Sequence, residues 1–142
     1  MSAAHEAPLR VVVGAGGVGK TTLAAALALR SAAAGHDTLV MTFDPSLRLK
    51  DALGVGDAAR GREVEIATDT PGRLAASLLD PRRTFDRLIR RYSPDEDACR
   101  RILENRFYDH LAGSLAGVLE YMAVERLYEV RAEGRYQRVI LD

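Results

Sequence analysis

The residues with the clearest chemical signature lie near the start of the chain, where a glycine-rich stretch runs into a lysine and a threonine. Gly14, four further residues, Gly19, Lys20 and Thr21 match the phosphate-binding pattern of glycine, any four residues, glycine, lysine, and serine or threonine. Glycines let backbone N–H groups turn inward around phosphate oxygens, and a helix that begins at such a loop presents further free N–H groups. The pattern therefore predicts a site for ATP and Mg²⁺.

The whole loop is assigned to the nucleotide, and two of its side chains have additional roles. We expect nucleotide contacts from Gly14, Ala15, Gly16, Gly17, Val18, Gly19, Lys20, Thr21 and Thr22. Lys20 is also a candidate catalytic residue, as a positive charge on the β and γ phosphates, and the Thr21 hydroxyl is a candidate Mg²⁺ ligand. The chain has 18 arginines but only two lysines, Lys20 and Lys50. A lysine in the loop of such a chain indicates a site where a slim ammonium is needed.

Two other interpretations of the loop exist. One is a glycine-rich turn between a strand and a helix that binds nothing. The other is a dinucleotide-binding fingerprint, which Gly14, Gly16 and Gly19 also satisfy, with Asp44 about where a ribose-binding acid is expected. The lysine and threonine that follow favour the triphosphate site, because the dinucleotide fingerprint has no use for a lysine directly after its third glycine.

Two acidic residues that follow predicted strands are candidates for roles in ATP hydrolysis and Mg²⁺ binding. Asp44 is a candidate catalytic residue, because an acid at the carboxyl end of a neighbouring strand faces the phosphates and can orient the attacking water. Its alternative role is turn initiation, since it precedes a proline. Asp142 is a candidate metal residue that holds Mg²⁺ through water, and its alternative is an ordinary acid at a strand end.

The elements around the loop are a strand, a helix and a second strand. Leu9–Val13 is short, apolar and β-branched, which favours a buried strand. Lys20–Ala34 is rich in alanine and leucine and ends at Gly35, which predicts a helix. Thr38–Phe43 is a second β-rich run. This order is best satisfied by a right-handed crossover between parallel strands.

The rest of the chain is expected to be mostly helical and to end in a buried strand. We expect a short helix over Leu47–Leu53, a strand over Glu63–Ala67, helices over Arg73–Leu79 and Pro81–Tyr92, a helix capped by Ser93, a long helix over about Leu115–Ala132, and a strand over Val139–Leu141. These elements predict an α/β fold, the P-loop NTPase three-layer sandwich with a mostly parallel sheet. Because the last strand resembles a central one, we expect residues 1–142 to be the N-terminal part of a single, incomplete domain.

The composition limits the classes of function. Lys plus Arg equals Asp plus Glu at 20 each, so no overall field attracts nucleic acid, and we expect no nucleic-acid partner. The chain has no long apolar run and no signal-peptide pattern, and its single cysteine, Cys99, fits a reducing compartment. We therefore expect a cytoplasmic protein. Cys99 by itself cannot build a three-thiolate arsenite site or a zinc pair.

A family resemblance is carried by three segments of the chain. They are Gly14–Thr22, Thr42–Ser46 and Glu120–Tyr128, and they resemble the anion-transporting (ArsA-like) ATPase family, which includes the arsenite-pump ATPase and the ATPase that targets tail-anchored membrane proteins. The resemblance implies that Asp44 is the switch I acid that positions the hydrolytic water and that Asp142 opens switch II. It also implies a homodimer, or a heterodimer with a related ATPase, and an anion or a membrane protein as cargo.

One residue departs from the family pattern. Ala15 stands where the deviant P-loop of this group has a second lysine, which in dimeric relatives reaches the nucleotide of the partner subunit. The departure leaves a nucleotide-binding switch, or a degenerate subunit with little turnover, as the alternative to an active ATPase.

Overall fold

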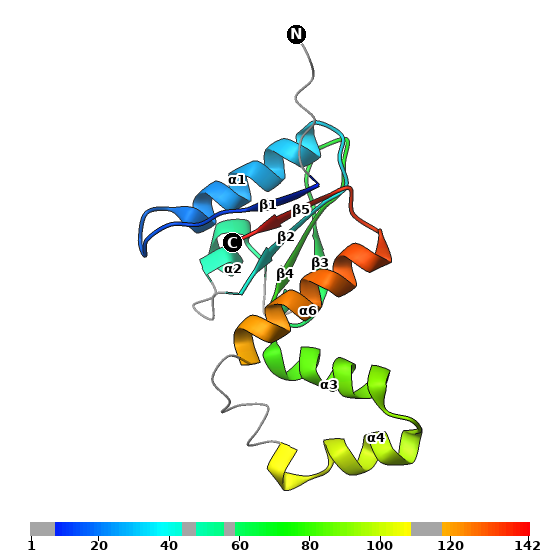
Figure 1. The fold of residues 1–142 in the computed structure, drawn as a ribbon. Coiled ribbons are helices and arrows are strands. Elements are labelled where there is room, and N and C mark those ends of the chain that lie inside the picture. Colours follow the sequence, from blue (N-terminus) through cyan, green and yellow to red (C-terminus); the bar gives the residue numbers. More distant parts are fainter. Residues whose placement is uncertain (1–7, 44–47, 56–58, 109–117) are drawn as a thin grey trace.

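The protein is represented by a computed structural model, which describes residues 8–43, 48–55, 59–108 and 118–142 (Figure 1). Its helices and strands are, in chain order, β1 (Leu9–Val11), α1 (Lys20–Ala33), β2 (Thr38–Thr42), α2 (Arg48–Leu53), β3 (Glu63–Ile66), β4 (Leu74–Leu78), α3 (Pro81–Tyr92), α4 (Glu96–Leu103), α6 (Val118–Glu133) and β5 (Arg138–Leu141). The candidate catalytic residue Asp44 lies outside the described residues.

The strands form one mostly parallel sheet in the order β1-β5-β2-β4-β3. β5 pairs in parallel with β1 and β2, and β2 pairs in parallel with β4, whereas β3 pairs antiparallel with β4. Every residue of β2 and β4 is buried, as expected for inner strands that are covered on both faces. Because β1, β5 and β2 run in the same direction, their carboxyl ends lie at one edge of the sheet (Figure 1). Residues from distant parts of the sequence meet at that edge.

Helices cover both faces of the sheet. On one face α1 buries Ala24, Ala28 and Ala32, which lie one turn apart and let the helix approach the strands closely. On the other face α6 packs Val130 into a second core with Leu39 of β2 (Figure 1). This arrangement confirms the predicted α/β fold with three layers and a mostly parallel sheet.

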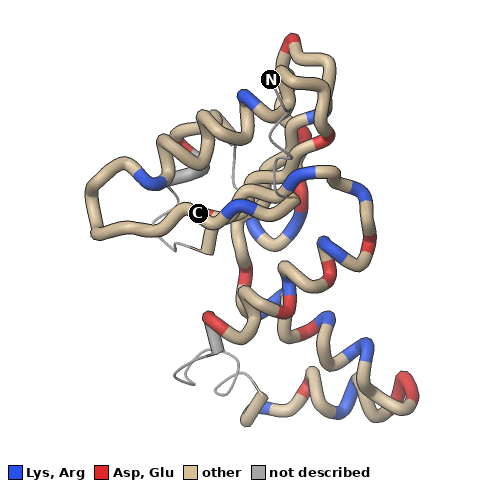
Figure 2. Tube along the Cα trace, turned by 45° about the horizontal axis from the view of Figure 1, so that its top comes forward, with Lys and Arg blue, Asp and Glu red and all other residues tan. Residues whose placement is uncertain are grey.

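A network of ion pairs, buried at its centre, joins α6 to α3 and to the edge strand β3. Arg126 of α6 donates to Glu63 of β3 over 2.5 Å and to Glu129 over 3.0 Å. Glu129 also accepts from Arg87 and Arg91 of α3, each over 3.1 Å. Figure 2 shows acidic and basic positions facing one another between the two helices. The side chains of Glu63, Arg126 and Glu129 are less than one tenth exposed, so the charges are largely removed from water and satisfied by one another.

The prediction of a helix over Arg73–Leu79 is wrong, because the segment forms β4, Leu74–Leu78. Its sequence, Leu-Ala-Ala-Ser-Leu, has high helix propensity and no polar and apolar alternation. A strand that is buried on both faces loses that alternation, and a short apolar run then cannot be assigned by periodicity. Pairing with β2 over five residues decides the outcome.

The prediction of Ser93 as the N-terminal cap of the next helix is also wrong. Ser93 ends α3, where its backbone N–H and its hydroxyl both donate to the carbonyl of Ile89. The N-cap of α4 is Asp95, whose carboxylate accepts from the N–H of Ala98 over 2.7 Å. Serine and aspartate are both good caps, and the choice between them depends on where the preceding helix ends.

The other predicted elements are confirmed, with their ends within two residues of the prediction wherever those ends are described. The helix predicted from about Leu115 is described from Val118 onward. Gly35 ends the first helix with a φ of 89°, as a left-handed glycine after a helix does.

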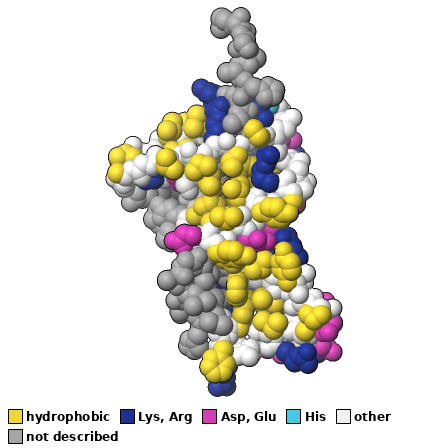
Figure 3. Space-filling view, viewed as in Figure 1, with side chains coloured by type: hydrophobic (Ala, Val, Ile, Leu, Met, Phe, Trp, Pro, Cys, Tyr) yellow, Lys and Arg dark blue, Asp and Glu magenta, His cyan; other side chains and the backbone are white. Residues whose placement is uncertain are grey.

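Two groups of exposed apolar side chains lie at β1 and on α6. The group at β1 includes Val11 and Val13, and the group on α6 includes Tyr121, Val124 and Tyr128. Figure 3, which has the same view as Figure 1, shows an upper and a lower group of hydrophobic side chains with charged side chains between them. Within the described part of the chain, none of the helices has the length and hydropathy that a bilayer crossing requires.

Candidate nucleotide-binding site

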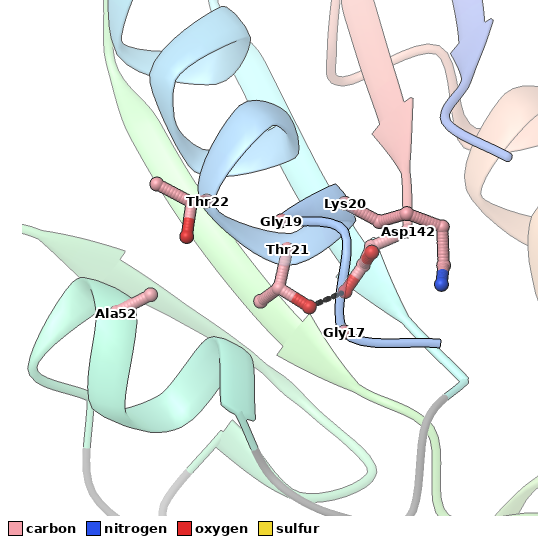
Figure 4. Close-up of a pocket in the computed structure, with 7 residues that line it drawn as sticks. All are labelled: Gly17, Gly19, Lys20, Thr21, Thr22, Ala52 and Asp142. Carbon is pink, nitrogen blue, oxygen red and sulfur yellow. Dashed lines mark hydrogen bonds between the residues drawn. The ribbon is translucent and has the colours of Figure 1, made fainter. Parts of the chain in front are cut away.

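The site is a pocket of about 490 Å³ at the edge of the sheet where the strands end and α1 begins (Figure 4). Its lining residues come from the loop, from α1, from α2 and from the end of β5. They are Gly17, Gly19, Lys20, Thr21, Thr22, Ala52 and Asp142. The pocket therefore lies where the order of parallel strands predicts a ligand site in an open α/β sheet.

The N-terminus of α1 is built to receive an anion. No side chain caps it, its first turn holds no acidic residue, and its N-cap is Gly19. Gly17 and Gly19 have φ values of 79° and 91°, which side chains other than glycine rarely adopt, so these two positions require glycine. The free N–H groups of the first turn and the positive end of the helix dipole face the pocket and favour negative charge.

Lys20 extends back over the loop. Its ammonium donates a hydrogen bond of 2.9 Å to the carbonyl oxygen of Ala15, five residues earlier. The contact is exposed to solvent, so the bond is easily exchanged for a bond to a ligand. The long side chain thus holds a positive charge at the mouth of the glycine loop.

The metal candidates Thr21 and Asp142 are brought together by the fold. The Thr21 hydroxyl donates to Oδ2 of Asp142 over 2.8 Å (Figure 4). Asp142 is held by the sheet, since its N–H donates to the carbonyl of Met41 over 2.8 Å. A hydroxyl oxygen and a carboxylate are hard oxygen donors of the kind that Mg²⁺ accepts, with one or two protein groups supplementing the phosphates. The residues present therefore fit Mg²⁺.

The remaining loop residues contribute backbone rather than side chains. Ala15 takes part through its carbonyl, and Val18 presents its side chain to solvent with 66 % exposed. Gly14 has Val18 close by, because a Cβ built on it would lie 3.3 Å from the Val18 side chain. Gly14, Ala15, Gly16 and Val18 do not line the pocket, whereas Gly17, Gly19, Lys20, Thr21 and Thr22 do. The assignment of the whole loop to the nucleotide stays a prediction.

Two residues of the site were not found from the sequence. Thr42, the last residue of β2, donates its hydroxyl to Oδ2 of Asp142 over 3.3 Å. Ala52 reaches the pocket from α2. A polar residue at the end of a buried strand is a signal that points to Thr42, whereas Ala52 has no chemical signature and is placed only by the packing of α2.

A mostly parallel sheet whose first strand runs through a glycine loop with lysine and threonine into a helix defines a P-loop NTPase. Comparison with known proteins narrows the class. The sequence model of the family described as "Anion-transporting ATPase" matches residues 9–142. The chain therefore belongs to the anion-transporting ATPase family, as the resemblance of its three segments predicted. Membership also favours the triphosphate site over the dinucleotide fingerprint.

Individual relatives agree with the family. The chain is 44 % identical over 72 residues to ATPase ARSA1 of Chlamydomonas reinhardtii, which is 50 % of this chain and 9 % of that protein. It is 30 % identical over 132 residues to ATPase get3 of Aspergillus terreus, 92 % of this chain and 38 % of the relative. It is also 28 % identical over 129 residues to ATPase GET3 of Malassezia globosa, which is 91 % of this chain and 36 % of that protein. The chain thus spans less than two fifths of the length of each of these relatives.

Proposed function

We propose that the protein binds Mg-ATP in the pocket at the N-terminus of α1 and hydrolyses it. The observation that carries the proposal is that three features meet at one pocket. They are the uncapped start of α1, the ammonium of Lys20, and the hydrogen-bonded pair of Thr21 and Asp142. Family membership supports the same nucleotide and the same class of reaction.

Each residue has a defined role in binding. The N–H groups of the loop and of the first turn of α1 cradle the phosphates, and Lys20 contacts the β and γ phosphates. Thr21 and Asp142 would hold Mg²⁺, the first through its hydroxyl oxygen and the second through water. When bound, Mg²⁺ supplies positive charge that neutralises the phosphate oxygens. Because the Thr21 proton is committed to Asp142, the lone pairs of the Thr21 oxygen remain for a cation.

Hydrolysis requires a group that orients the attacking water, and we propose Asp44 for this role. It follows β2 by two residues in the sequence, and β2 ends beside the pocket, where Thr42 contacts Asp142. An acid at this position can accept a proton from water and direct it at the γ phosphate in line with the leaving group.

The nucleotide state is proposed to be transmitted to a partner or cargo in the cytoplasm. Loops around Asp44 and Asp142 would close on the γ phosphate and reopen after hydrolysis. The exposed apolar residues Tyr121, Val124 and Tyr128 of α6 supply surface for an interaction. The partner is proposed to be a second copy or a related ATPase, and the cargo an anion or a membrane protein, by analogy with the family.

Ala15 favours a second candidate function, a nucleotide-dependent switch with little turnover. The proposed cross-subunit lysine of the family is absent at this position, so a dimer of this protein would lack that positive charge on the partner's nucleotide. If the protein is such a switch, we expect tight binding of Mg-ATP together with phosphate release close to the uncatalysed rate.

The binding of a fluorescent ATP analogue to the full-length protein tests the site. We expect Lys20→Ala to weaken ATP affinity at least about tenfold, because it removes charge-assisted hydrogen bonds to phosphate. Arg131→Ala, which removes one exposed positive charge from α6, is the matched control and should bind as the wild type does. Equal affinity of Lys20→Ala and the wild type, or preference for NAD over ATP, would contradict the proposal.

Phosphate release separates the enzyme from the switch. An active ATPase should lose turnover in Asp44→Asn by about a hundredfold while retaining Mg-ATP binding, because only the positioning of water is lost. Turnover that is unaffected by Asp44→Asn would refute the role of this acid, and negligible turnover in the wild type would favour the switch.

A further inference from the structure

Thr42 contacts the same carboxylate oxygen as Thr21. Its hydroxyl donates to Oδ2 of Asp142 over 3.3 Å, beside the 2.8 Å bond from Thr21. Thr42 is only 1 % exposed, so its hydroxyl is removed from bulk water and must find its acceptor within the protein. Two hydroxyls from different elements thus converge on one oxygen of the candidate metal residue.

The sheet fixes Thr42 next to Asp142 by backbone hydrogen bonds. The N–H of Asp142 donates to the carbonyl of Met41 over 2.8 Å, and on the other side the N–H of Leu79 donates to the carbonyl of Thr42 over 2.9 Å. The parallel register that pairs Met41 with Leu141 brings the next residues of β2 and β5 alongside each other. Thr42 therefore approaches the carboxylate from a rigid inner strand, whereas Thr21 approaches from α1.

We propose that Thr42 is a positioning residue, which holds the Asp142 carboxylate in the orientation that Mg²⁺ requires. The inference rests on the proposed function. A hydrogen bond donated by the Thr42 hydroxyl from a fixed strand limits rotation of the Asp142 carboxylate, and Thr21 keeps its own hydrogen bond to the same oxygen. Groups that orient a metal-binding carboxylate in this way typically change metal affinity 10- to 100-fold.

A smaller effect is expected for Thr42. Its 3.3 Å contact is longer than the 2.7–2.8 Å that is usual for hydroxyl donors, and Asp142 is proposed to reach the metal through water. We therefore expect the loss of the Thr42 hydroxyl to raise the Mg²⁺ requirement about fivefold.

Binding of a fluorescent ATP analogue at increasing Mg²⁺ tests the proposal without any measurement of turnover. In Thr42→Val, which keeps the β-branched shape, half-maximal enhancement of binding should need about five times more Mg²⁺, while affinity in EDTA stays at the wild-type value. Thr42→Ser should restore the wild-type Mg²⁺ requirement, because it restores the hydroxyl. If Thr42→Val does not fold, Thr42→Cys, whose thiol is a weak donor, is compared with Thr42→Ser and should need more Mg²⁺.

Thr38→Val is the matched control. Thr38 lies on the same strand and is 0 % exposed, but its hydroxyl contacts Ser31 and the carbonyl of His36. Its loss should affect stability and leave the Mg²⁺ requirement unchanged. Equal Mg²⁺ requirements in Thr42→Val and the wild type overturn the inference and leave the proposed function standing. A wild-type protein that shows no Mg²⁺-dependent nucleotide binding overturns both.

A double-mutant cycle without nucleotide or metal tests the contact itself. The shifts in urea midpoint caused by Thr42→Val and Asp142→Ala should be less than additive when the two are combined, because the first change removes an interaction that the second also removes. Thr38→Val and Asp142→Ala should be additive. Additivity in both cycles overturns the inference independently of any nucleotide.

Discussion

Thr21 of α1 and Asp142 at the end of β5 are 121 residues apart, yet the hydroxyl of Thr21 donates to Oδ2 of Asp142 over 2.8 Å. The bond links the helix that follows the glycine loop to the strand beside it. A hydroxyl whose proton points at a carboxylate presents its oxygen elsewhere. The pair therefore places a hydroxyl oxygen from α1 and a carboxylate from the end of β5 side by side in the lining of the pocket.

Asp142→Asn should separate metal binding from phosphate binding. The amide keeps an oxygen acceptor for Thr21 but removes the negative charge, so the Mg²⁺ requirement for binding of the ATP analogue should rise at least about tenfold. Affinity in EDTA should stay the same or rise about threefold, because a negative charge beside the phosphates is lost. Asp69→Asn, at an exposed position outside the pocket, is the control. A parallel loss of affinity with and without Mg²⁺ would contradict the metal role.

The buried ion pairs of Arg126 should contribute more to stability than the exposed ones of Arg135. The Arg126 side chain is 9 % exposed and pairs with Glu63 and Glu129, whose side chains are 8 % and 3 % exposed. Arg126→Met leaves these buried carboxylates short of a partner and should lower the free energy of unfolding by about 3 kcal/mol. Arg135 also pairs with Glu63, but its side chain is 52 % exposed, and Arg135→Met should cost at most about 1 kcal/mol.

Urea unfolding at 25 °C measures both values. Equal losses in the two variants would show that burial does not decide the contribution of these arginines, and would place the stability of the contact between α6 and β3 in apolar packing instead.

The sequence predicts the parts of this fold whose signals are local. The glycine loop, the alanine-rich α1 and the β-branched β1 are each recognised within a few residues, and the acid after β5 is found because strand ends meet at one edge. β4 is missed because its alanines and leucines suit a helix equally well, and only pairing with β2 decides. Thr42 has a local signal as a polar residue at the end of a buried strand, but its contact with Asp142 follows from the register of β2 and β5, which no local pattern contains.

Gly72, just before β4, should not tolerate a side chain. A Cβ built on it would lie 2.5 Å from the carbonyl oxygen of His36 and 2.7 Å from the backbone nitrogen and carbon of that residue. Backbone cannot yield as a flexible side chain can, so Gly72→Ala should lower the free energy of unfolding by about 2 kcal/mol. Gly16→Ala is the control, because a Cβ there meets nothing within 4 Å, and its effect without nucleotide should be within about 0.5 kcal/mol. Similar stabilities of the two variants would contradict the close approach.

The ion pair between Asp37 and Arg73 should make stability depend on acid pH. Asp37 accepts from the Arg73 guanidinium over 2.8 Å and from its backbone N–H over 2.9 Å, which ties the start of β2 to β4. The hydrogen bonds from Arg73 hold the pKa of Asp37 below its ordinary value of 3.8. The folded state therefore binds this proton less tightly than the unfolded state, so the contribution is complete above about pH 3.8 and is lost as pH falls through the lowered pKa.

Thermal unfolding of the wild type and Asp37→Asn between pH 6 and pH 2.5 measures this effect. The variant should unfold at a lower temperature at pH 6. The difference between the two midpoints should shrink below about pH 3.8, because the unfolded wild type takes up a proton on Asp37 there, whereas the folded wild type takes it up only at the lower, folded-state pKa. Asp69→Asn, which alters an exposed loop acid, should show no such convergence. A difference between the wild type and Asp37→Asn that stays constant down to pH 2.5 would mean that Asp37 acts through its shape alone and that its charge contributes nothing to the pairing of β2 with β4.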